Sequence, residues 1–387
     1  MTDADDLKPG WLYSINDIAK PDWQALFDNG YPFCSQAFLA ALEQGGSVDS
    51  NSGWQSQHLA VWQGEQLIAL VPGYLKTHSY GEYLFDWQIA QAYQQLQLPY
   101  YPKWIAALPF TPVTGPRLGM RQGTDQHAVL SVVCQFLKAE LTQGKLYSAQ
   151  WLYPEAELAT SLAEQGLWLR YDVQFLWQNQ RYTDFNDFLA RLNSRKRKQI
   201  AKERAACTGL SLQTLTGEQL TDSHWQQLIR CYQATYLKRS GHHGYITPQS
   251  FQLLAKTMAT QIVVFAAFDS QQPQQIVAAA LCFRGKDTLY GRYWGALEHN
   301  DYLHFELCYY QGIEYCIKRG LAFFDAGAQG EHKLKRGFAP VLRYGAYCFA
   351  DTPLSAAIQG YFKHEQRHLQ HYLQAAEAAL PYKALVK

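Results

Sequence analysis

The chain has 387 residues, more than one ordinary hydrophobic core accommodates, and this length predicts two domains. Its 34 Lys and Arg against 33 Asp and Glu give a formal charge of +1, which excludes a global electrostatic attraction to nucleic acid or membrane and makes charge recognition local. The eight cysteines include no C-x-x-C pair, the N-terminus is acidic and no apolar run is long enough to span a bilayer, so we expect reduced thiols and a cytoplasmic protein.

The first half of the chain predicts one α/β module that ends near residue 180. Residues 36–44 (QAFLAALEQ) have the spacing of a short amphipathic helix, and residues 58–62 and 67–75 flank the turn of a hairpin. We then expect, in chain order, a strand at 104–108, a helix at 125–141, a strand at 148–152, a helix at 155–165 and a strand at 168–177.

The second half predicts the same order of elements after a helix over residues 182–204. Helix 304–318 has one apolar stripe and ends at Gly320. The other expected elements are a helix at 248–258, strands at 262–268, 276–283, 288–296, 321–325 and 341–349, a short basic helix at 331–336 and a final helix at 354–379. Alternation of strands and helices indicates mixed sheets with helices on both faces. We therefore predict an α/β (α+β) protein of two tandem modules, 1–180 and 181–387.

Several strings resemble the FemAB-like family of proteins, which contain two tandem modules of the acyl-CoA N-acyltransferase (GNAT) fold. They are SYGEYLFDW at 79–87, PFTPVTGPR at 109–117, SRKRKQI at 194–200, YGRYWG at 290–295 and DAGAQGEHKLKRGF at 325–338. The resemblance covers nearly the whole chain. It implies the tandem fold and, more loosely, transfer of an acyl or aminoacyl group in cell-wall synthesis. The glycine-rich pyrophosphate loop of ordinary GNAT proteins is absent between Ala296 and His304.

Residues 325–338 are the first candidate site. Two glycines permit close backbone approach, and three cations stand beside the start of a short helix, where free N–H groups favour anions. We predict that this loop binds a phosphate-bearing donor through Gly327, Gly330, Lys333, Lys335 and Arg336. A solvated basic turn is the structural alternative.

Acyl transfer to an amine requires a base and donors to the developing oxyanion. Glu331 and His332 adjoin the cationic loop, and Glu306 follows the start of helix 304–318, so these three are the catalytic candidates. Glu306 has an equally good interpretation as a carboxylate that favours the helix N-terminus.

The acceptor candidates lie in both modules. On strand 288–296, alternation is expected to place Tyr290, Arg292 and Trp294 on one face, an arrangement suited to an anionic group. In the first module the resemblance implies a further acceptor set, for which a salt-bridged structural loop is the alternative: Tyr80, Glu82, Asp86, Trp87 and Arg117.

The segment 195–204 contains six cations and one Glu. Such a segment is usually a solvated helix face, but it suits phosphate contact with tRNA or with an anionic lipid through Arg195, Lys196, Arg197 and Lys198. We expect no metal site, because His242 and His243 have no ligands at metal-binding spacing.

Two functional hypotheses follow. In the first, the protein is an acyl- or aminoacyltransferase with no tightly bound cofactor. Acyl-CoA or aminoacyl-tRNA is its co-substrate, and the acceptor is an amine, such as that of a cell-wall precursor. In the second, it is a non-catalytic pair of degenerate GNAT modules that binds a cell-wall precursor or another phosphate-rich ligand. The missing pyrophosphate loop favours the second hypothesis, and the polar residues around Glu331 favour the first.

Overall fold

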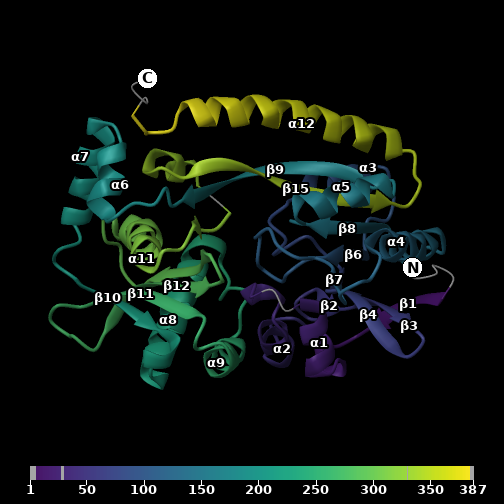
Figure 1. The fold of residues 1–387 in the computed structure, drawn as a ribbon, viewed down its shortest axis with the longest axis horizontal. Helices are drawn as coiled ribbons and strands as arrows, with labels where there is room; N and C mark the ends of the chain where they lie inside the picture. The colour runs from purple at the N-terminus through teal and green to yellow at the C-terminus, as the bar shows by residue number, and fades with distance from the viewer. Residues whose placement is uncertain (1–5, 28–29, 329, 384–387) are drawn as a thin grey trace. The chain divides into compact units, whose positions relative to one another are not determined.

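The computed structural model describes residues 6–27, 30–328 and 330–383 (Figure 1). The chain forms two compact units, and each is discontinuous in sequence. Unit 1 comprises Met1–Val173 and Leu342–His371, and unit 2 comprises Gln174–Val341 and Tyr372–Lys387. Residues 342–371, which the sequence analysis placed in the second module, therefore cluster with the first unit.

Unit 1 contains a small sheet of strand order β1-β3-β4-β7 and a second ladder of order β15-β8-β6-β5-β2. Sequence patterning predicted one strand over 67–75, but the chain passes from the first sheet to the second at Pro72, which has no N–H to donate to a continuous ladder. The strands are β1 (Leu7–Leu12), β2 (Trp54–Ser56), β3 (His58–Gln63), β4 (Gln66–Val71), β5 (Gly73–Lys76), β6 (Lys103–Ala106), β7 (Gly119–Met120), β8 (Ser148–Leu152) and β15 (Ala339–Phe349).

Two helices of unit 1 begin at residues whose side chains satisfy their first N–H groups. The Ser35 side chain accepts from the N–H of Phe38, and Asp125 accepts from the N–H groups of His127 and Ala128. The apolar face of the helix after Asp125 packs into the core between the strands. The helices are α1 (Lys20–Phe27), α2 (Gln36–Gln44), α3 (Trp87–Gln95), α4 (Gln126–Thr142) and α5 (Ala156–Glu164).

Unit 2 is built on a ladder of order β10-β11-β12-β13-β14-β9. Neighbouring strands are antiparallel except β13 and β14, which are parallel. β11 is buried along its whole length, as a strand with helices on both faces must be. The strands are β9 (Trp168–Gln178), β10 (Ser211–Thr216), β11 (Ile262–Phe268), β12 (Ile276–Arg284), β13 (Thr288–Ala296) and β14 (Phe323–Asp325).

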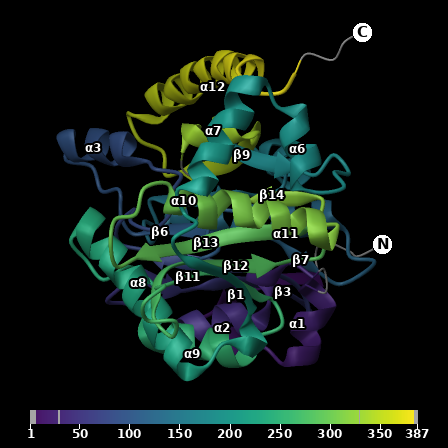
Figure 2. The same cartoon turned by 90° about the vertical axis from the view of Figure 1, so that its left-hand side faces the viewer.

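Helices cover both faces of this ladder (Figure 2). Tyr293 of β13 packs against Tyr232 and Phe251 of the helices on one face, whereas the next residue, Trp294, packs against His304 on the other. The helices are α6 (Phe185–Arg191), α7 (Ser194–Ala205), α8 (Asp222–Ser240), α9 (Pro248–Thr257), α10 (Leu303–Phe305) and α11 (Gln311–Arg319), with a 3-10 helix at Glu331–Arg336; α12 (Ser355–Ala378) begins in unit 1 and ends in unit 2.

Two helix predictions were wrong in detail. The helix expected over 182–204 is two helices, because Leu192 is extended and forms a bridge with Tyr382, and Asn193 then caps α7. The helix expected over 304–318 is interrupted by a π-helical turn, Glu306–Tyr310. Seven further elements were not predicted from the sequence: β1, α1, β2, α3, β7, β10 and α8.

Candidate functional site

Parallel strands β13 and β14 separate in the middle of unit 2. Their ladder ends at the pair Tyr290 and Asp325, while β13 continues to Ala296. Segments that leave the ends of such diverging strands form the crevice in which α/β proteins commonly bind ligands. Here those segments are the loop after Asp325 and the helix that begins at Leu303. This split is therefore the natural place to search for a site.

A β-bulge at the split corrects one prediction. Leu281 of β12 pairs with Tyr293, but Cys282 pairs with Gly291, so Arg292 is an extra residue in β13. The bulge reverses the alternation, and Tyr290 and Trp294 therefore lie on opposite faces of the sheet. The predicted single face containing Tyr290, Arg292 and Trp294 is wrong for this reason.

Five rings gather where the helix after β13 approaches the loop after β14. We call Trp294, His304, Phe305, Tyr309 and His332 the imidazole cluster. The ring centroid of His304 lies 5.2 Å from that of Trp294, 5.4 Å from that of Tyr309 and 6.0 Å from that of His332. The Tyr309 hydroxyl and the His332 Nε2 atom share a hydrogen bond of 2.7 Å. Four segments of unit 2 thus contribute to one group of polarisable side chains.

Both imidazoles of this cluster favour the uncharged form. Burial, followed by the charge of His332 and of Arg239, lowers the pKa of His304 to about 3. Burial and the neighbouring Arg336 and Lys333 also lower the pKa of His332 below its usual value. At neutral pH each ring therefore has one nitrogen lone pair that can accept a proton or a hydrogen bond.

The π-helical turn determines where Tyr309 and Tyr310 lie. The extra residue of a π turn rotates the following side chains relative to a regular helix, and such turns are frequent at functional sites. Tyr309 consequently contacts His332, while the Tyr310 hydroxyl donates to the buried carboxylate of Glu203. No signal in the sequence indicated this turn, because the apolar stripe is also compatible with a regular helix.

The three loop cations occupy different environments. Lys333 is buried and donates to the Gly327 carbonyl, and Lys335 is exposed. Arg336 is buried; it donates to Glu203 at 2.7 Å and to the Tyr310 hydroxyl at 2.7 Å, and it stacks on Phe305 with 3.5 Å to the ring centroid. Arg336 therefore holds the 3-10 helix against α7 and α10.

The loop glycines have backbones that L side chains rarely adopt. Gly327 has φ of 90° and Gly330 has φ of 113°. At Gly330 a Cβ atom would lie 2.4 Å from the His332 ring. Glycine at residue 330 thus allows the imidazole to fold back over its own loop.

The two candidate carboxylates differ sharply. Glu306 is buried, pairs with Arg204 at 3.1 Å and accepts from the Gln311 amide at 2.7 Å. Glu331 is exposed and accepts from the Tyr372 hydroxyl at 2.8 Å. Of the three predicted catalytic residues, His332 alone belongs to the imidazole cluster.

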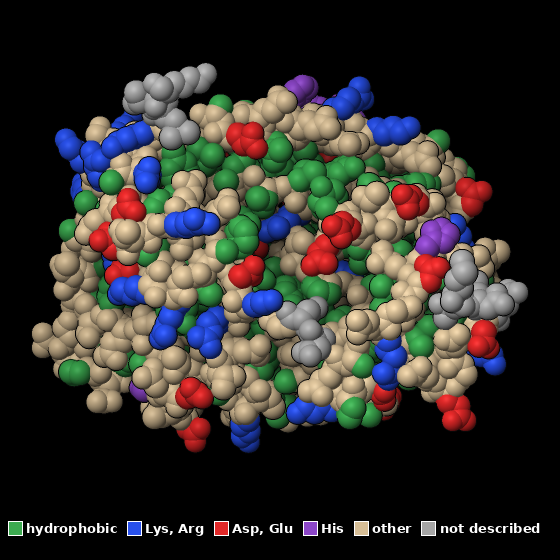
Figure 3. Space-filling view, in the orientation of Figure 1, with side chains coloured by type: hydrophobic (Ala, Val, Ile, Leu, Met, Phe, Trp, Pro, Cys, Tyr) green, Lys and Arg blue, Asp and Glu red, His purple; other side chains and the backbone are tan. Residues whose placement is uncertain are grey.

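The basic segment forms α7 in the same unit. Arg195, Lys198 and Lys202 are exposed, and Figure 3 shows Lys and Arg side chains gathered over this helix. Burial and the charge of the nearby Lys335 lower the pKa of Lys196 in α7. The α7 cations and the exposed loop cation therefore form one positive surface.

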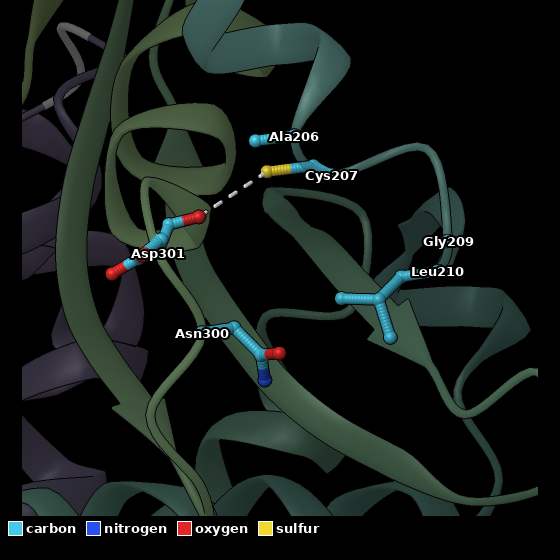
Figure 4. Close-up of a pocket in the computed structure, with 6 residues that line it drawn as sticks. All are labelled: Ala206, Cys207, Gly209, Leu210, Asn300 and Asp301. Carbon is cyan, nitrogen blue, oxygen red and sulfur yellow. Dashed lines mark hydrogen bonds between the residues drawn. The ribbon is translucent and has the colours of Figure 1, made fainter.

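A small pocket lies just before α10 (Figure 4). Its volume is about 200 Å³, and the Cys207 thiol reaches the Asp301 carbonyl oxygen over 3.9 Å. The lining is Ala206, Cys207, Gly209, Leu210, Asn300 and Asp301. Asn300 and Asp301 belong to the segment between Ala296 and His304, which lacks the pyrophosphate loop of ordinary GNAT proteins. The side chains that line the pocket include a carboxylate and no cation. This pocket is not suited to a phosphate group.

In unit 1, Lys103 is the centre of a buried ionic cluster that the sequence analysis missed. The Lys103 ammonium donates to Glu82 at 2.8 Å, to Asp86 at 2.5 Å and to the Ser79 hydroxyl at 2.8 Å. Lys76, directly opposite Lys103 in the ladder, is equally buried and stacks on Trp54. The predicted acceptor residues Glu82 and Asp86 are thus held by a lysine on β6.

Burial alters the protonation of these side chains. It raises the pKa of Glu82 to about 7 and lowers the pKa of Lys76 to about 7. The Lys103 ammonium overcomes the effect of burial on Asp86 and keeps its pKa below the usual value. The cluster therefore contains groups that change charge close to neutral pH.

The other predicted acceptor residues of unit 1 divide into two kinds. Arg117 is completely buried and donates to backbone carbonyls, including those of Leu152 at 2.7 Å and Val113 at 2.7 Å. It stabilises the loop that contains it. Tyr80 and Trp87 are 56% and 39% exposed, so their rings remain available to a ligand.

These folds and sites define a class of protein: two GNAT-like α/β modules in tandem. Two solved structures share this fold across the chain. The crystal structure of FemX superposes with a TM-score of 0.51 at 11% identity, over 90% of this chain and all of that one. The C-terminal domain (DUF2156) of a putative lysylphosphatidylglycerol synthetase from Agrobacterium fabrum gives 0.51 at 12% identity, over 92% and 98% of the two chains.

The sequence gives a more specific assignment. Residues 14–384 match the FemAB-like family, described as peptidoglycan biosynthesis/recognition, and the chain belongs to this family. A search of curated proteins finds no match. The predictions of family and fold class are thereby confirmed. Among the helices of the described residues, none combines the length and apolarity that crossing a membrane requires.

Proposed function

We propose that the protein transfers an acyl or aminoacyl group from a phosphate-bearing donor to an amine of a cell-wall precursor, and that the reaction takes place at the imidazole cluster of unit 2. The observation that carries the proposal is the pair of uncharged imidazoles beside a tyrosine hydroxyl at the split of β13 and β14. Membership of the FemAB-like family supports the substrate class.

The chemistry needs a proton acceptor and a proton donor near the acyl carbon. The amine nitrogen bonds to the carbonyl carbon, loses a proton to a base and displaces the donor's leaving group. We assign the base to His332, because it is uncharged at neutral pH, half-buried and connected to Tyr309 by a hydrogen bond. His304 and Tyr309 are assigned to polar contacts with the acyl carbonyl.

The donor phosphates would meet the positive surface of α7 and Lys335. Exposed cations attract phosphate through a salt-dependent interaction, whereas Lys333 and Arg336 are already bonded within the fold. We assign phosphate contact to Arg195, Lys196 and Lys335, and a positioning role to Arg336. Acyl-CoA and aminoacyl-tRNA are the two donors to test.

The experiment incubates purified protein with each donor and with peptidoglycan precursors and detects acylated product by mass spectrometry. We expect His332→Gln to lower turnover by about 10²-fold or more, the range for loss of a general base. Because burial and neighbouring cations lower the pKa of His332, wild-type turnover should decline only below about pH 6.5.

Glu331→Gln is the matched control, since it alters the adjacent, exposed side chain. Full turnover of His332→Gln would show that another group is the base. Binding of every donor and precursor without product would favour the alternative, a recognition protein. The pocket before α10, whose lining contains no cation, is the observation that supports this alternative of a recognition protein.

A further inference from the structure

An exposed aromatic surface in unit 1 has no role in the transfer chemistry described above. It consists of Tyr80, Phe85 and Trp87, which lie within one short segment and are 56%, 41% and 39% exposed. The Trp87 ring lies 5.0 Å from that of Tyr80 and is stacked on that of Phe85 at 6.1 Å. Gathered aromatic rings of this kind mark interaction sites, because their removal from water is favourable.

A cavity of about 510 Å³ adjoins this surface. Its volume is within the range that holds small molecules. Three aromatic side chains and three amides contribute to its lining: Trp87, Tyr100, Tyr101, Gln91, Gln94 and Gln97. Trp87, Gln91 and Gln94 recur at the spacing of one helix face on α3, so this helix offers a ring followed by two amides.

Hydrogen bonds to the buried ionic cluster around Lys103 hold two tyrosines of the cavity wall in place. The Tyr101 hydroxyl and the Ser79 hydroxyl share a hydrogen bond of 2.8 Å, and the Tyr100 hydroxyl donates to Asp86. Both Ser79 and Asp86 are held by the Lys103 ammonium. The tyrosine rings are therefore pre-organised, and a ligand would not have to order them.

The chemistry of the lining selects the ligand. The lining residues carry no charged side chain, so a phosphate, carboxylate or ammonium group would lose its water without gaining a counter-charge. Glutamine amides both donate and accept, which suits hydroxyl and acetamido groups that also do both. The flat apolar faces of Trp and Tyr suit the C–H faces of a sugar ring.

We propose that this cavity, with Trp87 at its edge, binds an uncharged glycan that carries N-acetyl groups. The inference goes beyond the proposed function and does not depend on it. The binding itself needs no donor and no reaction, so it is measured independently of transfer.

The experiment titrates the full chain with a tetramer of β-linked N-acetylglucosamine by isothermal titration calorimetry. We expect saturable binding that is unchanged between about 50 and 500 mM NaCl, because no charge lines the cavity. Trp87→Ala should weaken binding by about tenfold or more, and Gln91→Ala with Gln94→Ala should weaken it as well. Tyr13→Ala is the matched control: Tyr13 is 61% exposed in the same unit and does not line the cavity.

Three results would overturn the proposal: no saturable binding by the wild type, equal affinity of the Trp87→Ala variant, or equal losses in Trp87→Ala and Tyr13→Ala. A membrane contact is tested with vesicles of phosphatidylcholine and phosphatidylglycerol; vesicle binding that Trp87→Ala abolishes, without glycan binding, would assign the surface to lipid instead. Glycan binding without any transfer would leave this inference intact and remove the proposed function. Transfer without glycan binding would do the reverse.

Discussion

Single residues in unit 2 have roles that their chemical type alone does not decide. Lys335 and Arg336 are adjacent cations at the end of one short helix. The first is exposed and the second is buried against Glu203, Tyr310 and Phe305. Of these two neighbouring cations, Lys335 is thus available to a ligand and Arg336 stabilises the fold.

Substitution separates these two roles. Arg336→Ala removes one partner of a buried ion pair and leaves the Glu203 charge unpaired, so we expect a loss of about 3–5 kcal/mol in the free energy of unfolding. Lys335→Ala should change that free energy by less than about 0.5 kcal/mol, as is usual for exposed side chains. Urea unfolding of both variants measures the difference. Equal stabilities would contradict the structural role of Arg336.

The imidazole of His304 links stability to pH. Its pKa is about 3 in the folded protein, well below that of an unfolded chain, so unfolded molecules bind a proton that folded ones do not. The stabilisation that this residue provides is fully present above about pH 6.5 and is lost as pH falls towards 3, by at most ~1.4 kcal/mol per pH unit.

His304→Asn should therefore flatten the dependence of unfolding free energy on pH between about 6.5 and 4. Urea unfolding at pH 7, 6, 5 and about 4 follows this dependence. His127→Asn, at an exposed residue of unit 1, is the control. A slope that His304→Asn leaves unchanged would show that other groups produce the acid sensitivity.

At the scale of elements, close contact between α8 and β13 depends on one glycine. A Cβ atom on Gly295 would lie 2.1 Å from the backbone carbon of Cys231 in α8. Gly295→Ala must push α8 away from β13, because the atoms that the new Cβ would contact are backbone atoms, which cannot change rotamer as a flexible side chain can. We expect a loss of several kcal/mol in unfolding free energy, roughly 3 or more.

The control is Gly209→Ala, since a Cβ atom at that residue has no heavy atom within 4 Å. Thermal unfolding followed by circular dichroism compares the two variants. A Gly295→Ala protein as stable as the control would show that α8 and β13 are separated more widely than the structure has them.

Most elements with a regular apolar spacing were predictable. Helix 36–44 and the short basic helix at 331–336 occur at the predicted residues, because caps and periodicity are local properties. The bulge at Arg292 and the π turn at Glu306–Tyr310 were not predictable. Both depend on hydrogen-bond register with other segments, and one extra residue leaves the local composition unchanged.

At the scale of the molecule, each unit needs a distant part of the chain. β15 supplies a neighbour to β8, pairing Gly345 with Leu152, and Glu365 forms an ion pair with Arg170 at 2.8 Å within unit 1. A fragment that ends at residue 180 has neither partner. Its β8 would still pair with β6 but would become an edge strand with one open side, and such strands are prone to association.

We therefore expect a fragment of residues 1–180 to aggregate or to remain partly unfolded, and a fusion of 1–173 to 342–371 through a flexible linker to fold. Circular dichroism and size-exclusion chromatography distinguish these outcomes. A folded, monomeric 1–180 fragment would support the continuous division near residue 180 that the sequence analysis predicted.

The sequence by itself determined the helices and strands with regular apolar spacing, the membership of the FemAB-like family and the glycine-bearing loop before the 3-10 helix, because these follow from local spacing and recognisable strings. Tertiary structure alone decided which groups meet. Arg336 donates a hydrogen bond to Glu203, and Lys103 donates to Glu82 and Asp86. His332 shares a hydrogen bond with Tyr309. Each of these contacts joins residues far apart along the chain, and their geometry depends on strand register and helix phase, which no local pattern specifies.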